Sequence, residues 1–182
     1  IVFVVIASFL FIFVLLGALS PTLASNTANI FPPESKPYGL TYVEHIKNFW
    51  KWVVAIPMKE SPLDDPTGEK CANGQSNTNS SVFYLSVNNG GISERTCKVS
   101  AGKGLLIPVM VVVWTDKEAP GASIEELGKS AKKDQDSVTS LYLKIGDKEY
   151  KYQDLIKYRT PTDAFEVVFP DNGIFGVIEG GV

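Results

Sequence analysis

Hydrophobic residues dominate the start of the chain, before any helical or alternating pattern begins. Residues 1–19 carry one polar side chain, Ser8, and no charge, and small residues then lead to Ala24. A secretory signal has an apolar core of roughly 7 to 15 residues, whereas a membrane span needs about 20. Because the run lies between these lengths, we expect residues 1–24 to form a hydrophobic helix that is a signal peptide or a membrane anchor. Cleavage after Ala24 is the favoured interpretation.

Two later segments show helical periodicity. Thr41 and Glu44 have the spacing of a capping box, and apolar residues recur at helical spacing until Pro57. Ser123 and Glu126 form a second capping box that opens another short amphipathic run. The sequence therefore predicts two short helices.

The other apolar segments are rich in β-branched and aromatic residues, which predicts strands. These segments are residues 82–87, 92–99, 105–114, 141–145, 148–152, 165–169 and 174–178. The third is nearly all apolar, as in a central strand covered on both faces. Gly146 and Asp147 form a two-residue turn of the kind that closes hairpins. The pattern predicts a mainly β fold, an antiparallel β-sandwich with two short helices.

Domain organisation follows from the length and the polar stretches. Residues 25–40 are rich in Asn, Ser and Pro and show no hydrophobic period, which predicts a linker. The length that remains, residues 41–182, fits a single β-sandwich-like domain with a sizeable core. Its last residues have the pattern of a strand that enters a turn and stops, so we expect this domain to be truncated at its C-terminus.

Charge and cysteine content narrow the classes of partner and compartment. The chain has 17 Lys and Arg against 20 Asp and Glu, which argues against a nucleic-acid partner because phosphates require a basic face. Cys71 and Cys97 are the two cysteines, and outside the cytoplasm we expect them to form a disulfide. A Cys-based metal or redox site is disfavoured, because the His and extra Cys partners that it would need are lacking.

Residue patterns of the large enzyme classes do not occur. The single histidine, His45, has no second imidazole four residues away and no Cys pair nearby, so a metal site or general base is disfavoured. The sequence also lacks the Gly-x-Ser-x-Gly, His-Glu-x-x-His, Walker and dinucleotide-binding patterns. We assign no catalytic residue.

One loop gathers three carboxylates, Asp64, Asp65 and Glu69. Oxygen ligands on an extracellular loop suit Ca²⁺, so these residues are the candidate calcium site. The favoured alternative is that they shape turns, because the alternating Asp spacing of dedicated calcium loops is missing. We therefore expect no cofactor, with Ca²⁺ as the less favoured case.

Aromatic residues supply the candidate ligand contacts. Trp50 and Trp52 are two apart, so on a helix they point about 200° from each other, and one belongs to the core while the other can reach the surface. Tyr150 and Tyr152 share one face of the predicted hairpin. We take Trp52, Tyr150 and Tyr152 as candidates for stacking on a ligand, with cross-strand packing as the favoured use of the two tyrosines.

Two arginines and one sequon complete the candidates. In a Lys-rich chain, Arg95 and Arg159 indicate fixed bidentate geometry, and we expect them in structural ion pairs. Asn79 opens an Asn-Ser-Ser sequon in the polar loop and is a candidate glycosylation site.

A series of short motifs runs through residues 41–165. They are Trp50-x-Trp52, Ile56-Pro57, Ser61-Pro62-x-Asp64, Gly68-x-x-Cys71, Gln75, Val82-Phe83-x-Leu85, Arg95-Thr96-Cys97-x-Val99, Ala101-Gly102-Lys103 and Pro108. In this order they resemble a family of uncharacterised exported bacterial and archaeal proteins. The resemblance implies an export signal, two cysteines placed like Cys71 and Cys97, and further strand-forming sequence beyond residue 182. It carries no enzymatic role to transfer to this chain.

Together these observations favour an extracytoplasmic, non-enzymatic binding or structural domain. Its expected partner is an envelope protein or a glycan, and also the membrane if the N-terminal segment is retained. One alternative is an exported hydrolase or carbohydrate-active enzyme that uses carboxylates such as Asp64, Asp65 or Glu94. Another alternative is an anchored accessory subunit of a membrane complex.

Overall fold

A computed structural model describes residues 2–15, 29–75, 80–88 and 90–174. Within these ranges it has one six-stranded sheet and one two-stranded sheet. The strands are β1 Val2–Leu15, β2 Asn29–Ile30, β3 Val82–Tyr84, β4 Gly104–Thr115, β5 Tyr142–Ile145, β6 Lys148–Lys151, β7 Arg159–Pro161 and β8 Phe165–Val168. The helices are α1 Tyr42–Val54, α2 Ile124–Asp136 and α3 Tyr152–Leu155, with 3₁₀ turns at Pro37–Gly39, Met58–Glu60, Pro62–Asp64 and Ile156–Tyr158.

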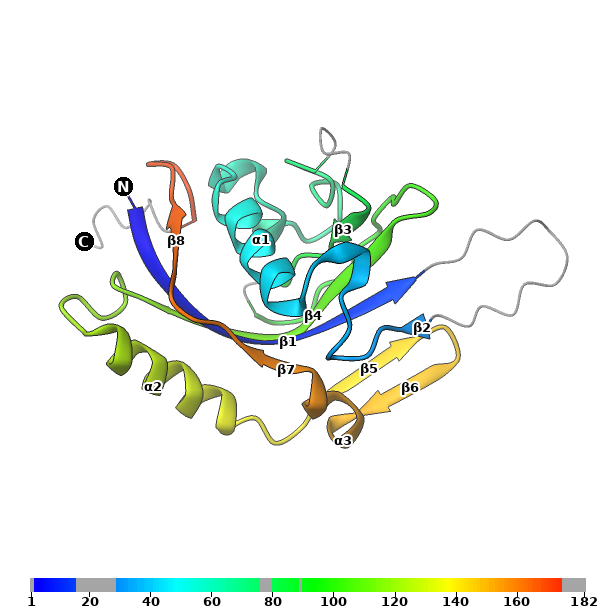
Figure 1. The fold of residues 1–182 in the computed structure, drawn as a ribbon. Coiled ribbons are helices and arrows are strands. Elements are labelled where there is room, and N and C mark those ends of the chain that lie inside the picture. The colour runs from blue at the N-terminus through cyan, green and yellow to red at the C-terminus, as the bar shows by residue number, and fades with distance from the viewer. Residues whose placement is uncertain (1, 16–28, 76–79, 89, 175–182) are drawn as a thin grey trace, which may run out of the picture.

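Strand β1 lies in the middle of the large sheet. One of its sides pairs antiparallel with β4, and the other pairs antiparallel with β2, β7 and β8 in turn. The short strand β3 is added to the far side of β4 and runs parallel to it. Figure 1 shows that the long strands curve, with α1 on the concave side of the sheet and α2 on the opposite side.

The hydrophobic segment at the start of the chain is a strand, so the helix predicted for it is wrong. Val2–Leu15 pairs on both sides and lies between two layers of helix (Figure 1). A strand covered on both faces is apolar at nearly every position, and periodicity alone does not distinguish such a run from an apolar helix. The expectation that residues 1–24 are a signal peptide or an anchor stays a prediction. None of the helices in the described ranges has the length and apolar character that crossing a membrane requires.

The predicted β-sandwich is also wrong. A sandwich packs two sheets face to face, whereas helices cover the large sheet here, and β5 with β6 forms a separate small hairpin. Residues 92–99, expected as a strand, have irregular structure. They meet a loop instead of a strand, because the Thr96 N–H donates to the Thr67 carbonyl oxygen at 2.9 Å. The fold is therefore a mixed arrangement of helices and sheet.

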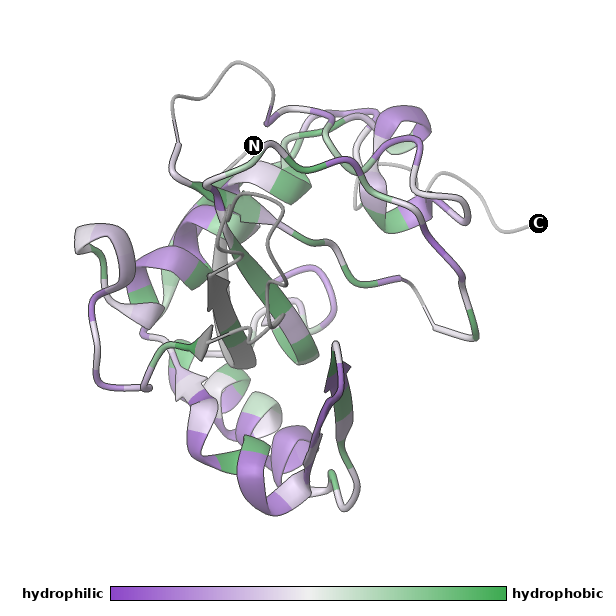
Figure 2. Cartoon of the chain, turned by 90° about the vertical axis from the view of Figure 1, so that its right-hand side faces the viewer, coloured by the Kyte–Doolittle hydropathy of each residue, from purple (hydrophilic) through white to green (hydrophobic). Residues whose placement is uncertain are grey.

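Local signals in the sequence are confirmed. Both capping boxes form, Thr41 with Glu44 before α1 and Ser123 with Glu126 before α2. The helices show purple and green bands in Figure 2, as amphipathic helices do. Gly146, at a φ of 58°, turns the hairpin between β5 and β6. Turn and cap chemistry therefore predicted these elements correctly.

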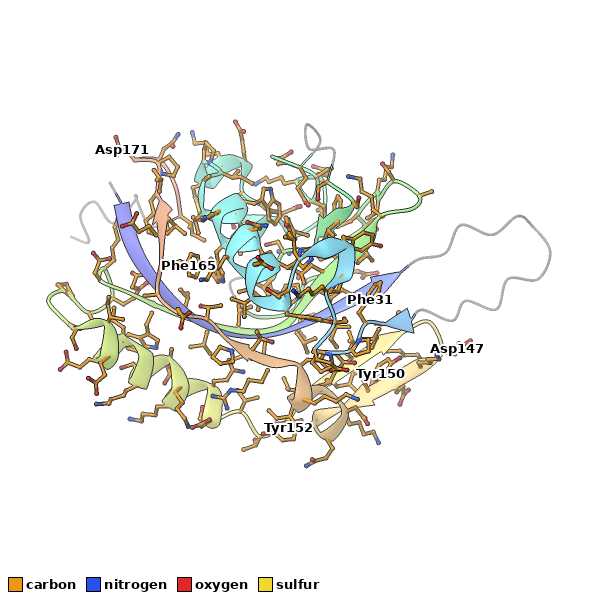
Figure 3. All side chains as sticks on the ribbon, in the orientation of Figure 1. Phe31, Asp147, Tyr150, Tyr152, Phe165 and Asp171 are labelled. Atoms are coloured by element: carbon orange, nitrogen blue, oxygen red, sulfur yellow. A yellow bond between two sulfur atoms is a disulfide. The ribbon has the colours of Figure 1, made fainter. Side chains whose placement is uncertain are left out.

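The main core lies largely between α1 and the sheet, and the same cluster continues to Leu155 of α3 and Tyr158. Ile46, Phe49 and Leu106 each have 0 % exposure and belong to one cluster that also contains Val167 of β8. Figure 3 shows Phe165 between β8 and α1. This packing fixes α1 against the sheet and leaves one edge of the helix free to line a surface hollow.

Candidate functional site

A hollow of about 510 Å³ opens beside the C-terminal half of α1. Its walls come from α1, from the loop after it and from Tyr84 at the end of β3. The described residues that line it are Asn48, Trp52, Ala55, Ile56, Gly74, Gln75, Ser80 and Tyr84. None of these side chains carries a formal charge at neutral pH. We call this hollow the Trp52 pocket.

Helical spacing builds the first wall of the Trp52 pocket. Asn48, Trp52 and Ala55 follow one another at intervals of four and three residues, so they lie on one face of the helix. Trp50 points away into the core and is only 4 % exposed, whereas Trp52 is half-buried. Of the two tryptophans on α1, Trp52 is therefore the one that reaches a ligand-accessible surface.

Trp52 and Tyr84 make the aromatic part of the pocket. Their ring centroids are 5.7 Å apart and their planes are inclined by 31°. The Trp52 indole N–H donates to the Asn73 carbonyl oxygen at 2.9 Å, which fixes the ring. Burial raises the pKa of the Tyr84 hydroxyl, and its hydrogen bond with the Asn48 side chain only partly opposes this rise. The phenol therefore stays protonated at neutral pH and keeps a hydrogen-bond donor beside the hollow.

Gln75 connects the loop wall to strand β3. Its side chain is 6 % exposed. The amide nitrogen donates to the Cys71 and Tyr84 carbonyl oxygens at 2.8 and 3.0 Å, and the amide oxygen accepts from the Tyr84 N–H at 2.7 Å. Three bonds to backbone groups fix the amide in one orientation. Gln75 therefore holds the loop wall of the pocket in a fixed position against β3, which carries Tyr84.

Gly74 allows the loop to pass close to the indole. Its φ is +69°, a region that favours glycine. A Cβ atom at this position would come within 3.0 Å of the Trp52 Nε1 and 3.2 Å of the Ile56 Cδ1. A side chain here would therefore press into the pocket.

Asp65 organises the loop that supports the pocket. The carboxylate is 2 % exposed and accepts four hydrogen bonds, from the Thr67 N–H and hydroxyl, the Gly68 N–H and the Lys70 N–H. Burial alone would raise the pKa of the Asp65 carboxyl, but these hydrogen bonds outweigh burial and lower it. Asp65 therefore shapes a turn, which is the alternative that the sequence favoured over calcium binding.

The remaining candidate calcium ligands do not join Asp65 around a common point. Asp64 and Glu69 are exposed, and the described residues contain no group of three His, Cys, Asp or Glu side chains arranged to hold a metal. Calcium ligation by Asp65 itself would compete with the four hydrogen bonds that its carboxylate accepts.

A disulfide joins Cys71 to Cys97, as the sequence predicts. The two Cα atoms are 5.7 Å apart, and the bond ties the Asp65 loop to the segment that leads into β4. Gly68 lies against this segment, because a Cβ atom there would come within 2.6 Å of the Thr96 carbonyl oxygen. The loop wall of the pocket is therefore crosslinked to the irregular segment that precedes β4.

Two of the candidate aromatics lie elsewhere. Tyr150 is on β6, opposite Leu143, and is half-buried against the main core. Tyr152 is the first residue of α3 and does not continue the hairpin strand. Figure 3 shows both tyrosines near the hairpin and α3, below the sheet and away from α1. The structure therefore brings Trp52 into the pocket but not Tyr150 or Tyr152.

The two arginines differ in their partners. Arg159 pairs with Asp136, with Nη1 and Oδ1 2.5 Å apart. Arg95 donates instead to the carbonyl oxygens of Ser86 and Val87, at 3.1 and 3.2 Å. Arg159 thus makes a structural ion pair, whereas Arg95 holds an irregular backbone segment.

Other residues singled out from the sequence are not part of the pocket. His45 is 1 % exposed, and its Nε2 lies 2.8 Å from the Pro37 carbonyl oxygen, so it is a packed helix residue. Glu94, a carboxylate of the hydrolase alternative, is exposed and does not line the hollow. Asn79 lies outside the described residues.

Sequence reasoning missed several pocket residues. Asn48 carried a usable signal, because it precedes Trp52 by four residues and so shares its helix face. Tyr84 looked like an ordinary strand residue, and no local pattern relates it or Gln75 to α1. The contact between these segments depends on how the chain folds back over the helix.

Comparisons with known proteins give no match: no family model, no curated protein and no solved structure resembles the chain significantly. The resemblance to exported bacterial and archaeal proteins therefore stays a prediction.

Proposed function

We propose that the protein is an extracytoplasmic, non-enzymatic binding domain that holds a neutral glycan in the Trp52 pocket. The observation that carries this proposal is the pairing of two aromatic rings with uncharged amide and hydroxyl groups in one hollow. A sugar ring has an apolar C–H face and a rim of hydroxyl groups. Such a ligand suits an aromatic wall edged by a few polar groups.

The polar edge of the pocket supports this ligand class. Asn48 is exposed, and its side chain bonds the Tyr84 hydroxyl, so amide and phenol form a short polar rim next to the indole. The lining residues have no net charge that would select an anion or a cation. Neutral sugars are therefore favoured over acidic or basic ligands.

The same pocket favours binding over hydrolysis. A typical glycosidase places two carboxyl groups about 5 to 10 Å apart across the scissile bond. None of the described residues that line the Trp52 pocket is Asp or Glu. The buried carboxylate of Asp65, in the loop that supports the pocket, already accepts hydrogen bonds from backbone N–H groups.

The Cys71–Cys97 disulfide supports a location outside the cytoplasm. Disulfides persist in oxidising compartments and are rare where thiols are kept reduced. Glycans of the cell envelope or extracellular matrix are accessible to a protein in such a location.

A titration with neutral oligosaccharides, followed by intrinsic tryptophan fluorescence and by calorimetry, tests the proposal. We expect saturable binding that weakens about tenfold in Trp52→Phe, equivalent to ~1.4 kcal/mol. Trp114→Phe is the matched control, because Trp114 lies on β4 and its indole N–H donates to Asp134 of α2 at 2.8 Å. No binding of any neutral glycan at millimolar concentration, or equal losses in the two variants, would contradict the proposal.

A further inference from the structure

Within the described part of the chain, the outer side of β4 is paired only at its beginning. On its inner side β4 pairs with β1 from Gly104 to Thr115. On its outer side β3 pairs with residues 104–106. Among the residues that the structure describes, no strand pairs with the outer side of residues 107–115. Strand β4 therefore becomes an edge strand for most of its length.

Hydrogen bonds to the residues on either side of β3 show which residues of β4 face outward at its start. The Gly104 N–H donates to the Ser81 carbonyl oxygen at 2.9 Å, and the Leu106 carbonyl oxygen accepts from the Leu85 N–H at 3.0 Å. Backbone groups alternate between the two sides of a strand. Even-numbered residues therefore face outward in this first part of β4.

A bulge then reverses the alternation. The register with β1 passes from Pro108 to Met110 and leaves out Val109, so odd-numbered residues face outward beyond it. Thr115 agrees with this assignment, because its N–H donates to a Glu118 side-chain oxygen at 2.9 Å. The N–H and C=O groups of residues 111 and 113 therefore point to the unpaired side.

The edge lacks the features that usually prevent strand pairing. Charged side chains, proline and bulges protect natural edge strands. Pro108 and the bulge protect only the part next to β3, and residues 110–114 contain neither a charge nor a proline. Val111 and Val113 pack against the main core, and Val112 and Trp114 pack against α2, yet all four remain partly exposed. An added strand would extend both apolar layers.

We propose that this edge binds the same edge of a second copy of the chain, by antiparallel pairing about a two-fold axis at Val112. In this register Val111 lies opposite Val113 of the partner subunit, so outward backbone groups meet outward backbone groups. Residues 104–115 carry no charge, so no like charges are brought together along the paired strands. The interface is self-complementary, as a two-fold interface requires.

Cysteine crosslinking tests both the dimer and its register. In the proposed pairing the two copies of residue 112 face each other as a non-hydrogen-bonded pair, with Cα atoms about 4.5 Å apart. This separation lies within the range that a disulfide can bridge, about 4.4–6.8 Å. Met110→Cys is the matched control, because its two copies would be about 13 Å apart along the strands.

We expect the wild-type protein to sediment with twice the mass of one chain. Under mild oxidation, Val112→Cys should form a covalent dimer on a non-reducing gel, and Met110→Cys should not. A wild-type protein that sediments as a single chain at all concentrations would overturn the proposal, and this result does not depend on how either variant folds. Equal crosslinking of the two variants, or none in Val112→Cys, would overturn the register. Neither result bears on glycan binding.

Discussion

At the scale of single residues, three buried or half-buried polar side chains near the disulfide form hydrogen bonds mainly with the backbone. Asp65 accepts hydrogen bonds from three residues of its loop, Gln75 bonds the backbone of two segments, and Arg95 donates to two carbonyl oxygens. Buried polar groups cost free energy unless they are bonded in this way. The irregular regions around the pocket are therefore specified by a small number of side chains.

His45 makes stability depend on pH. Burial lowers the pKa of its imidazole, and the hydrogen bond to Pro37 and the charge of Glu44 only partly offset this. The folded protein therefore favours neutral His45, whereas the unfolded chain binds a proton near the ordinary pKa of about 6.5. We expect the free energy of unfolding to fall as pH drops below about 6.5, until the folded-state pKa is passed.

Urea denaturation at several pH values between 5 and 7.5 measures this effect. In His45→Gln the amide can still donate to the Pro37 carbonyl oxygen but does not titrate, so the decline between pH 6.5 and 5 should become shallower. An unchanged decline would show that other groups cause the pH dependence.

At the scale of elements, we expect the conformation of the loop from Asp65 to Gln75 to depend on the Asp65 carboxylate. Asp65→Asn replaces an acceptor oxygen by an NH₂ group and removes the charge that strengthens the remaining bonds. We expect the free energy of unfolding to decrease by about 1.5–3 kcal/mol. Asp64→Asn is the control, because the exposed Asp64 side chain should change stability by less than about 0.5 kcal/mol. Equal effects of the two substitutions in chemical denaturation would contradict the assigned role.

Elements with their own local chemistry could be predicted from the sequence, and elements that depend on distant partners could not. Capping boxes and the Gly146 turn act within a few residues, so both helices and the hairpin were predicted correctly. For β1 the sequence wrongly predicts a helix, because an apolar run without alternation suits either element. Residues 92–99 alternate like a strand but meet the Asp65 loop instead.

The candidate site shows the same division. Trp52 was expected at a ligand surface from helical spacing, and Asn48 shares that spacing. Gln75 and Tyr84 belong to the pocket only because the chain returns across α1 after the loop. No periodicity or motif in the sequence predicts such a contact between segments that are far apart in the chain.

At the scale of the whole molecule, the disulfide connects the loop beside α1 to the segment that leads into β4. It closes a loop with a sequence separation of 26 residues. In the chain-entropy model, closure of this length stabilises the fold by about 3.5 kcal/mol. We expect the Cys71→Ser, Cys97→Ser double variant to lose about this free energy of unfolding, measured by denaturant titration. A wild-type midpoint that does not change when reductant is added would contradict this prediction.

The three hydrogen bonds of Gln75 affect the shape of the Trp52 pocket before a ligand binds. Because the loop and β3 are already held together, the aromatic wall keeps its shape before any ligand arrives. Binding of a ligand in the Trp52 pocket would then cost little conformational entropy of the protein, so a modest number of contacts would give measurable affinity. The surface is preorganised, and amide protons at its base should exchange slowly with solvent even in the free protein.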